Sequence, residues 1–112
     1  MYKSNSNAKW KLYYTYTKSE VYKLDFCDNC YISLEYFKSK YAIAKLYDKN
    51  GKSLDYIAPD IEIESVSSVE KAMQIAETKF SIYFHNKSVE YKELEKALTN
   101  CKGFKELSAQ NL

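Results

Sequence analysis

Glycine, proline and arginine are scarce or missing in this chain of 112 residues. With only two glycines and one proline, the sequence lacks the material for flexible linkers, collagen-like repeats and glycine-rich phosphate loops. No apolar run approaches the length of a membrane-spanning helix, and the first seven residues contain no apolar segment of a secretory signal. We therefore expect a single α+β domain over residues 1–112, frayed at 1–8 and 105–112, in the cytoplasm and without membrane contact.

The 17 basic residues are all lysine. Arginine is the usual residue for bidentate recognition of guanine edges and phosphates, whereas lysine acts as a hydrated point charge. Sequence-specific reading of DNA is therefore disfavoured. The net charge of +2 also hides an uneven distribution, because residues 53–70 contain acidic residues and no lysine. Such a stretch can steer a partner of opposite charge. Its members are Asp55, Asp60, Glu62, Glu64 and Glu70.

Apolar and polar residues alternate from residue 9 to residue 58, as in strands with one buried face. Breaks at residues 18–19 and 28–29 separate the first three strands. Asn50-Gly51 then predicts a type I′ hairpin between strands at 41–48 and 52–58, because both residues tolerate the positive φ that this turn needs. A short strand with Ile61 and Ile63 on one side follows Pro59.

Tyrosine is unusually frequent, with 12 copies. The alternation places Tyr13, Tyr31 and Phe37 on the strand faces opposite to the core. Exposed rings in number favour recognition, because a rigid amphipathic ring gives a large contact area at a low entropic cost. A register slip of one residue, or tyrosine in place of aliphatic core residues, would explain them equally well. The aromatic residues that we assign to the core are Trp10, Tyr14, Tyr16, Tyr22, Tyr36, Tyr83 and Tyr91.

The period of the pattern changes after residue 66. Ser67 stands three residues before Glu70, in the spacing of a capping box, and apolar residues then recur at helical intervals. We predict a helix from about Ser68 to Phe84, and a second helix that Ser88 caps and Gly103 ends. The expected fold is α+β, with an antiparallel β-meander of about five to six strands followed by two helices packed on one sheet face.

Cys27 and Cys30 form a Cys-x-x-Cys motif with three interpretations. Together with Cys101 and His85 they contain the ligand types of a zinc site, although the turn lacks the glycine or proline that such sites usually carry. A disulfide across the turn is a second option, because turn ends lie within about 7 Å of each other. We favour the third interpretation, reduced and partly buried cysteines beside a hairpin turn.

No residue pattern indicates an enzyme. His85 is the only histidine, and its place at the end of the first helix suits an interaction with the terminal carbonyls. No serine or cysteine stands in a glycine-flanked elbow. The alternating Asp60, Glu62 and Glu64 are typical of the solvated face of an edge strand. We therefore expect no catalytic residues, no cofactor and no metal ion.

The main functional hypothesis is a small binding protein that occupies a surface of another protein. In this hypothesis the five acidic residues of 53–70 contact a basic nucleic-acid-binding surface of the partner, and Tyr13, Tyr31 and Phe37 supply contact area. Size and composition suit a phage or mobile-element product that blocks a host defence protein, as anti-CRISPR proteins do. The alternative is a single-strand nucleic-acid binder, in which the same rings stack on bases and Lys9, Lys11 and Lys38 neutralise phosphates.

Overall fold

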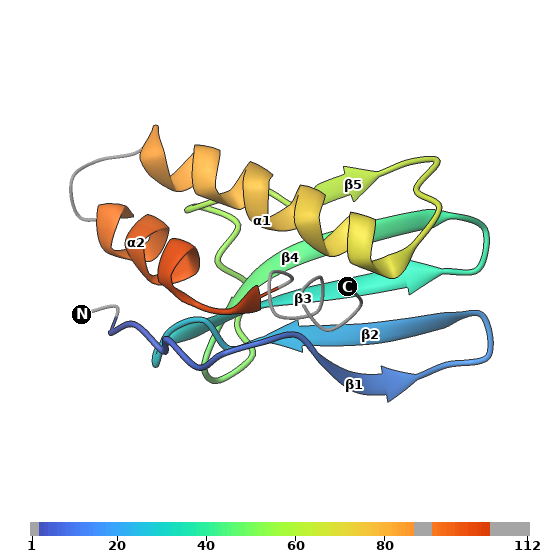
Figure 1. Ribbon diagram of the computed structural model, residues 1–112, viewed down its shortest axis with the longest axis horizontal. Coiled ribbons are helices and arrows are strands. Elements are labelled where there is room, and N and C mark those ends of the chain that lie inside the picture. Colours follow the sequence, from blue (N-terminus) through green and yellow to red (C-terminus); the bar gives the residue numbers. More distant parts are fainter. Residues whose placement is uncertain (1–2, 87–90, 104–112) are drawn as a thin grey trace.

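The computed structural model of the chain describes residues 3–86 and 91–103. Within these residues, five strands form one antiparallel sheet in the order β1-β2-β3-β4-β5, and two helices follow them. Figure 1 shows both helices on one side of the sheet. The predicted α+β meander with helices on one sheet face is therefore confirmed. The elements are β1 (Lys11–Thr15), β2 (Ser19–Leu24), β3 (Cys30–Phe37), β4 (Tyr41–Asp48), β5 (Ile61–Ile63), α1 (Val69–His85) and α2 (Lys92–Asn100).

The sheet has an inner face toward the helices and an outer face away from them. Along β3 and β4, buried residues alternate with half-exposed ones, which is the burial pattern of strands covered on one side. Helix α1 contacts β3 and β5, and α2 contacts α1. The buried side chains of the inner face are Leu24, Ile32, Leu34, Ala42, Ala44, Leu46, Ile61 and Ile63.

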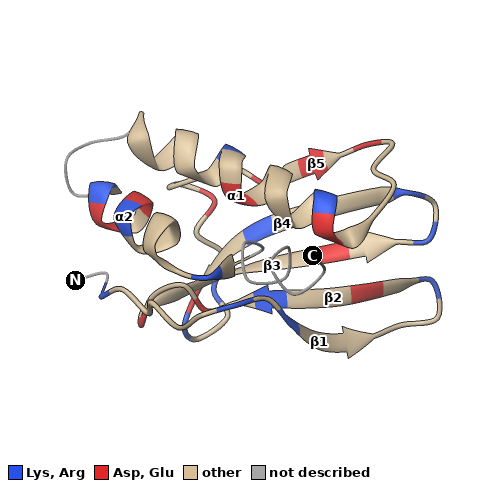
Figure 2. Ribbon diagram, viewed as in Figure 1, with Lys and Arg blue, Asp and Glu red and all other residues tan. Residues whose placement is uncertain are grey.

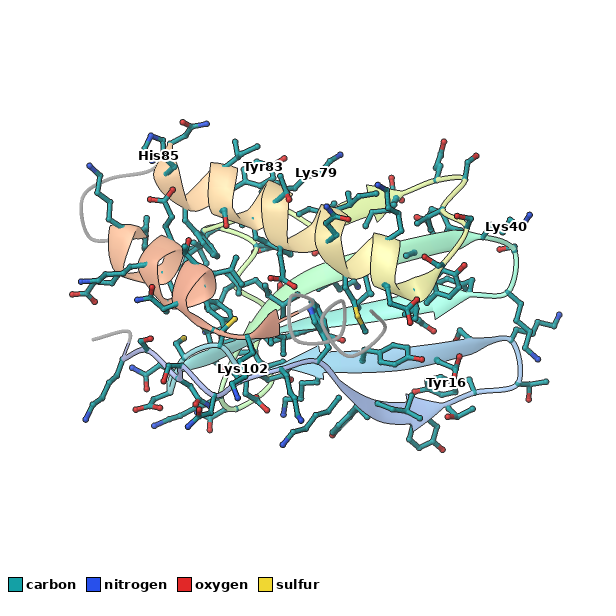
Figure 3. The ribbon with its side chains drawn as sticks, in the orientation of Figure 1. Tyr16, Lys40, Lys79, Tyr83, His85 and Lys102 are labelled. Carbon is teal, nitrogen blue, oxygen red and sulfur yellow. The ribbon has the colours of Figure 1, made fainter. Side chains whose placement is uncertain are left out.

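Helix α1 closes the core with its apolar stripe. Ala76, Phe80 and Phe84 are buried along this stripe, and the rings of Phe80 and Phe84 stack on each other. The Phe84 ring also stacks at 6.2 Å on the ring of Phe26, which follows β2. Full burial of such a side chain contributes about 1.5–3 kcal/mol to stability. The predicted core position of Tyr83 is wrong, because Tyr83 lies on the exposed side of the helix and points away from the sheet (Figure 3).

The N-terminus of α1 differs by one residue from the predicted capping box. Ser68 is the N-cap, with extended backbone, and its Oγ accepts a hydrogen bond from the backbone N–H of Lys71 at 3.1 Å. Ser67 is exposed and precedes the cap. The predicted start of the helix near residue 68 and its end near residue 84 agree with the structure. For the second helix, the predicted cap Ser88 lies outside the described residues.

The first strand carries the largest departure from the predicted pattern. Trp10 is buried as expected, but Tyr14 and Tyr16 are exposed. The reason is a β-bulge: Leu12 pairs with Tyr22, whereas Tyr14 pairs with Val21, so one extra residue enters β1 between them. A bulge moves every later side chain to the opposite face of the strand. The predicted core position of Tyr14 and Tyr16 is therefore wrong.

The Asn50-Gly51 hairpin forms, but its turn type differs from the predicted one and its second strand is shorter than predicted. Gly51 has a φ of +85°, whereas Asn50 does not have a positive φ, so the loop is not type I′. The Oδ1 atom of Asp48 accepts hydrogen bonds from the N–H groups of Asn50 and Lys52, which fixes the loop. The predicted strand at 52–58 is reduced to one bridge between Ser53 and Tyr47, and a turn follows it.

The N-terminal segment is held in place by the turn between β2 and β3. The backbone N–H of Asn5 donates to the carbonyl of Phe26, and that of Asp28 donates to the carbonyl of Lys3. Ala8 is buried, and its carbonyl accepts from the N–H groups of residues 102 and 103 after α2. Residues 3, 5 and 8 thus make backbone hydrogen bonds to the rest of the domain. Residues 105–112, also expected to be frayed, lie outside the described residues.

Neither helix of the described residues is both long and apolar enough to cross a membrane.

Candidate binding surface

The outer face of the sheet carries most of the half-exposed aromatic side chains. Three pairs of residues lie opposite each other on this face in the strand register: Tyr14 and Val21, Tyr31 and Tyr47, and Phe37 and Tyr41. Because the helices lie on the other face, these side chains are open to solvent in the described structure. We define the outer face by Lys11, Tyr13, Tyr14, Tyr16, Val21, Lys23, Tyr31, Ser33, Glu35, Phe37, Tyr41, Ile43, Lys45, Tyr47 and Glu62.

One end of the outer face is organised around a lysine. The Nζ atom of Lys23 lies 4.1 Å from the ring centroid of Tyr31 and 5.3 Å from that of Tyr13. The ring of Tyr31 also stacks on that of Tyr47 at 5.5 Å. The pKa of Tyr31 is raised, mainly because its side chain is partly buried and secondly by the charge of the neighbouring Tyr47. A cation over an aromatic face is an attractive contact, so Lys23 joins the rings of Tyr13 on β1 and Tyr31 on β3.

The other end of the outer face joins aromatic rings to a carboxylate. The rings of Phe37 and Tyr41 lie 5.7 Å apart across the β3–β4 pair. The hydroxyl of Tyr41 donates a hydrogen bond to Oε1 of Glu62 on β5 at 2.7 Å, and this bond raises the pKa of Tyr41. Glu64, just after β5, is close enough to raise the same pKa through its charge. Figure 2 shows acidic positions on β5 and in the segment that follows it.

A third aromatic pair lies at the free edge of the sheet. The rings of Tyr14 and Tyr16 are 4.6 Å apart, and both side chains are exposed. Figure 3 shows Tyr16 at the end of β1 that leads into the turn to β2. All five residues of β1 are exposed, so this edge offers both unpaired backbone groups and aromatic rings.

Most charges near the outer face have a partner within the chain. Lys45 lies 3.7 Å from Asp60, and Lys23 lies at the same distance from Asp25. The hydroxyl of Ser19 donates to Glu35 at 2.7 Å. The surface that remains for a ligand is therefore mainly aromatic, with a balanced charge.

The structure brings some of the predicted site residues together and separates others. Tyr13, Tyr31 and Phe37 lie on the outer face, as the alternation predicts, and Asp60, Glu62 and Glu64 lie along its β5 edge. Asp55 is exposed in the turn after residue 54, and Glu70 lies in the first turn of α1, near Tyr22 on the inner side. The acidic stretch is thus not one surface, because Glu70 lies on the helix side of the sheet, whereas Asp60, Glu62 and Glu64 lie along the β5 edge of the outer face.

The sequence pattern did not predict several members of this surface. Tyr14 and Tyr16 reach it only because of the bulge in β1. Tyr41 and Tyr47 on β4 are separated by the same number of residues as Tyr31 and Phe37 on β3. The antiparallel register therefore pairs Tyr41 with Phe37 and Tyr47 with Tyr31. That spacing is the signal that could have identified them, once the β3–β4 hairpin is assumed.

The cysteines and His85 form no common site. Cys27, Cys30 and Cys101 are buried, and His85 lies 3.1 Å from Glu95, where it links α1 to α2. In residues 3–86 and 91–103, no group of three or more histidine, cysteine or acidic side chains could hold a metal ion. The side chain of His85 thus contacts the second helix, and the N–H of Asn86 caps the carbonyls at the end of α1.

No protein-family model, no curated protein and no solved structure matches the chain.

Proposed function

We propose that this chain is a small, non-enzymatic binding protein that acts in the cytoplasm by occupying a surface of another protein. The observation that carries the proposal is the outer face, where three aromatic pairs lie on one side of a sheet whose other side is covered by helices. Tyrosine-rich patches with fixed side chains are typical of protein-recognition surfaces, because little rotamer entropy is lost when they bind.

The charge pattern of the outer face favours a protein partner over nucleic acid. Lys45 is paired with Asp60, and Glu62 lies on the same surface, so the β4–β5 half of the face is acidic or neutral. A nucleic-acid surface would need an excess of lysine there, because phosphate neutralisation supplies most of the affinity.

The β5 edge suggests which class of partner such a surface would block. Glu62 and Glu64 lie next to Tyr41, whose ring contacts that of Phe37, and Asp60 lies on the same edge next to Lys45. Carboxylates flanked by aromatic rings complement a basic groove, and a protein that binds nucleic acid has such a groove. In this proposal the chain is an inhibitor, and the phage or mobile-element origin with an anti-CRISPR-like role is its most specific form.

The test compares two double variants of the tagged full-length chain. The first is Tyr13→Ser with Tyr14→Ser, at two exposed positions of β1. The second, as a matched control, is Tyr56→Ser with Tyr83→Ser; Tyr56 has the same 67% exposure as Tyr13 but lies in the turn that precedes β5, and Tyr83 lies on α1. A partner is identified by co-purification from the native cells and mass spectrometry, and its affinity for each purified variant is then measured by titration.

We expect the β1 variant to bind the purified partner about tenfold or more weakly, which is a loss of about 1.4 kcal/mol, and the control to bind as the wild type does. Replacing Asp60, Glu62 and Glu64 by lysine should abolish binding while circular dichroism shows an intact fold. Equal affinity of all variants would contradict the proposed surface.

A second candidate function rests on the lysines at the β1 end of the same face. Lys11 lies directly opposite Lys23, and Lys23 lies over the rings of Tyr13 and Tyr31. Proteins that bind single strands combine basic side chains with aromatic rings on which bases stack. If the chain binds single strands, a labelled oligonucleotide will bind with an affinity that falls steeply with salt and that drops for Lys11→Gln. Absence of binding at low salt would eliminate this candidate.

A further inference from the structure

The turn between β2 and β3 holds two thiols in contact. Cys27 and Cys30 stand at its two ends, and their Sγ atoms are 2.7 Å apart. A disulfide bond needs about 2.05 Å, so the sulfur atoms must approach each other by only about 0.7 Å to form one. Neighbouring backbone also fixes the turn, because the N–H of Lys49 donates to the carbonyl of Asn29 and that of Asp28 donates to Lys3.

We propose that Cys27 and Cys30 are a site of reversible oxidation, at which a small-molecule disulfide converts the two thiols into an intramolecular disulfide. This inference is independent of the proposed binding function. Cys101 is excluded from the pair, because its thiol donates to the carbonyl of Leu98 at the end of α2.

The environment assigns different roles to the two sulfur atoms. The hydrogen bond from the Cys30 thiol, together with hydrogen bonds from the backbone of Asn29 and Cys30, lowers the pKa of Cys27. The same contact with Cys27 and the burial of the side chain raise the pKa of Cys30. Since the thiolate is the nucleophile, Cys27 is the attacking residue and Cys30 is the resolving residue.

The reaction consists of two thiol–disulfide exchanges. The Cys27 thiolate attacks one sulfur of the small-molecule disulfide, forms a mixed disulfide and releases one small thiolate. Cys30 then loses its proton and attacks the Sγ atom of Cys27, which forms the Cys27–Cys30 bond and releases the second thiolate. Two protein thiols are oxidised, and one small disulfide is reduced to two small thiols. A dithiol reductant reverses both steps.

The N-terminal segment controls access to the pair. The two side chains are only 5% and 2% exposed, and Ser4 forms a bridge with Cys27 while Asn5 hydrogen-bonds to Phe26. The oxidant can therefore reach Cys27 only when residues 3–5 open locally. Oxidation should therefore be slow compared with that of an exposed thiol.

The test uses the full chain carrying Cys101→Ser, whose hydroxyl can keep the hydrogen bond to Leu98. The probe is oxidised glutathione, followed by acid quenching, denaturation, alkylation of free thiols and intact-mass measurement. We expect a product that lacks the mass of two hydrogen atoms, takes up no alkylating agent and carries no glutathione. Dithiothreitol should restore both thiols.

The matched control adds Cys30→Ser to the same chain. Without the resolving thiol, a mixed disulfide between glutathione and Cys27 should accumulate instead of the bridged form. If either variant fails to fold, peptide mapping of the oxidised wild-type chain gives the same answer through a linked Cys27–Cys30 peptide. Two alkylated thiols after incubation, or glutathione on both cysteines, would overturn the proposal.

Discussion

The indole Nε1 of Trp10 donates a hydrogen bond to Oε2 of Glu77 at 2.7 Å in the interior of the protein. This bond joins the segment before β1 to the middle of α1, across 67 positions of sequence. Glu77 is one of two buried polar residues in the described core, and a buried carboxylate is costly unless hydrogen bonds satisfy it. The pair therefore fixes how the N-terminal segment lies against the helix.

We predict that Trp10→Phe lowers the free energy of unfolding by about 2 kcal/mol, because it removes the indole donor from the buried carboxyl group of Glu77. Glu77→Gln should cost less, since its amide oxygen can still accept from the indole. Urea denaturation followed by far-ultraviolet circular dichroism gives both values, as the Trp10 variant has no tryptophan fluorescence. Tyr13→Phe, which removes an exposed hydroxyl, serves as the control and should leave the midpoint unchanged.

Gly103 packs against the same carboxylate. Its φ is +46°, and a Cβ atom at this position would lie 2.5 Å from Oε1 of Glu77. Gly103→Ala should therefore destabilise the chain by about 2–3 kcal/mol, from backbone strain and displacement of Glu77. Gly51→Ala is the matched comparison, because Gly51 also has a positive φ but the nearest atom, the Tyr31 hydroxyl oxygen, is 3.9 Å away. It should cost only the backbone part, about 1 kcal/mol. Equal losses of unfolding free energy for the two variants would contradict the contact with Glu77.

Two neighbouring serines precede α1, and only Ser68 is its N-cap. Ser68→Ala should lower the free energy of unfolding by about 1 kcal/mol, because its Oγ satisfies the N–H of Lys71 at the start of α1. Ser67→Ala should have no measurable effect, although the sequence pattern assigned the cap to Ser67. Thermal unfolding of the two variants under identical conditions distinguishes the assignments, and a larger loss for Ser67 would reverse them.

Local patterns predicted the elements well because period and turn residues act over a few positions. The bounds 41–48 of β4 agree with the prediction, and α1 differs by about one residue at each end. The wrong core positions of Tyr14 and Tyr16 depended on a single added residue. The bulge between Leu12 and Tyr14 changes no local propensity, yet it reverses the faces of Tyr14 and Tyr16.

The candidate surface was predictable only strand by strand. Alternation alone placed Tyr13, Tyr31 and Phe37 away from the core, but the contacts of Lys23 with two rings and of Tyr41 with Glu62 depend on which residues face each other across strands. That register follows from tertiary pairing and turn geometry, so no single segment encodes it. The close approach of Cys27 and Cys30 is the exception, because one short turn determines it.

The bulge in β1 leads to a prediction about stability. Tyr14→Ser and Tyr16→Ser should each change the free energy of unfolding by no more than about 0.5 kcal/mol, because both rings are exposed. Leu34→Ala, on the inner face of β3, should cost about 2–5 kcal/mol as a positive control. If either tyrosine variant approached the loss of Leu34→Ala, the ring would lie in the core and the register without a bulge would be correct.

The contact between Tyr41 and Glu62 predicts a titration at high pH. The hydrogen bond to Glu62 raises the pKa of Tyr41 above its ordinary value of about 10, because it stabilises the protonated hydroxyl in the folded state. Its contribution to stability is therefore complete below pH about 10 and is lost as the pH rises through the higher pKa of the folded state. Glu62→Gln should lower the pKa of Tyr41, as measured by nuclear magnetic resonance of isotope-labelled tyrosine with Tyr41→Phe to assign the signal. Glu64→Gln should lower it less, because the charge of Glu64 is the weakest of the causes that raise it. An unchanged pKa in Glu62→Gln would show that β5 does not hold its carboxylate against β4, and would remove the link between the acidic edge and the aromatic rings.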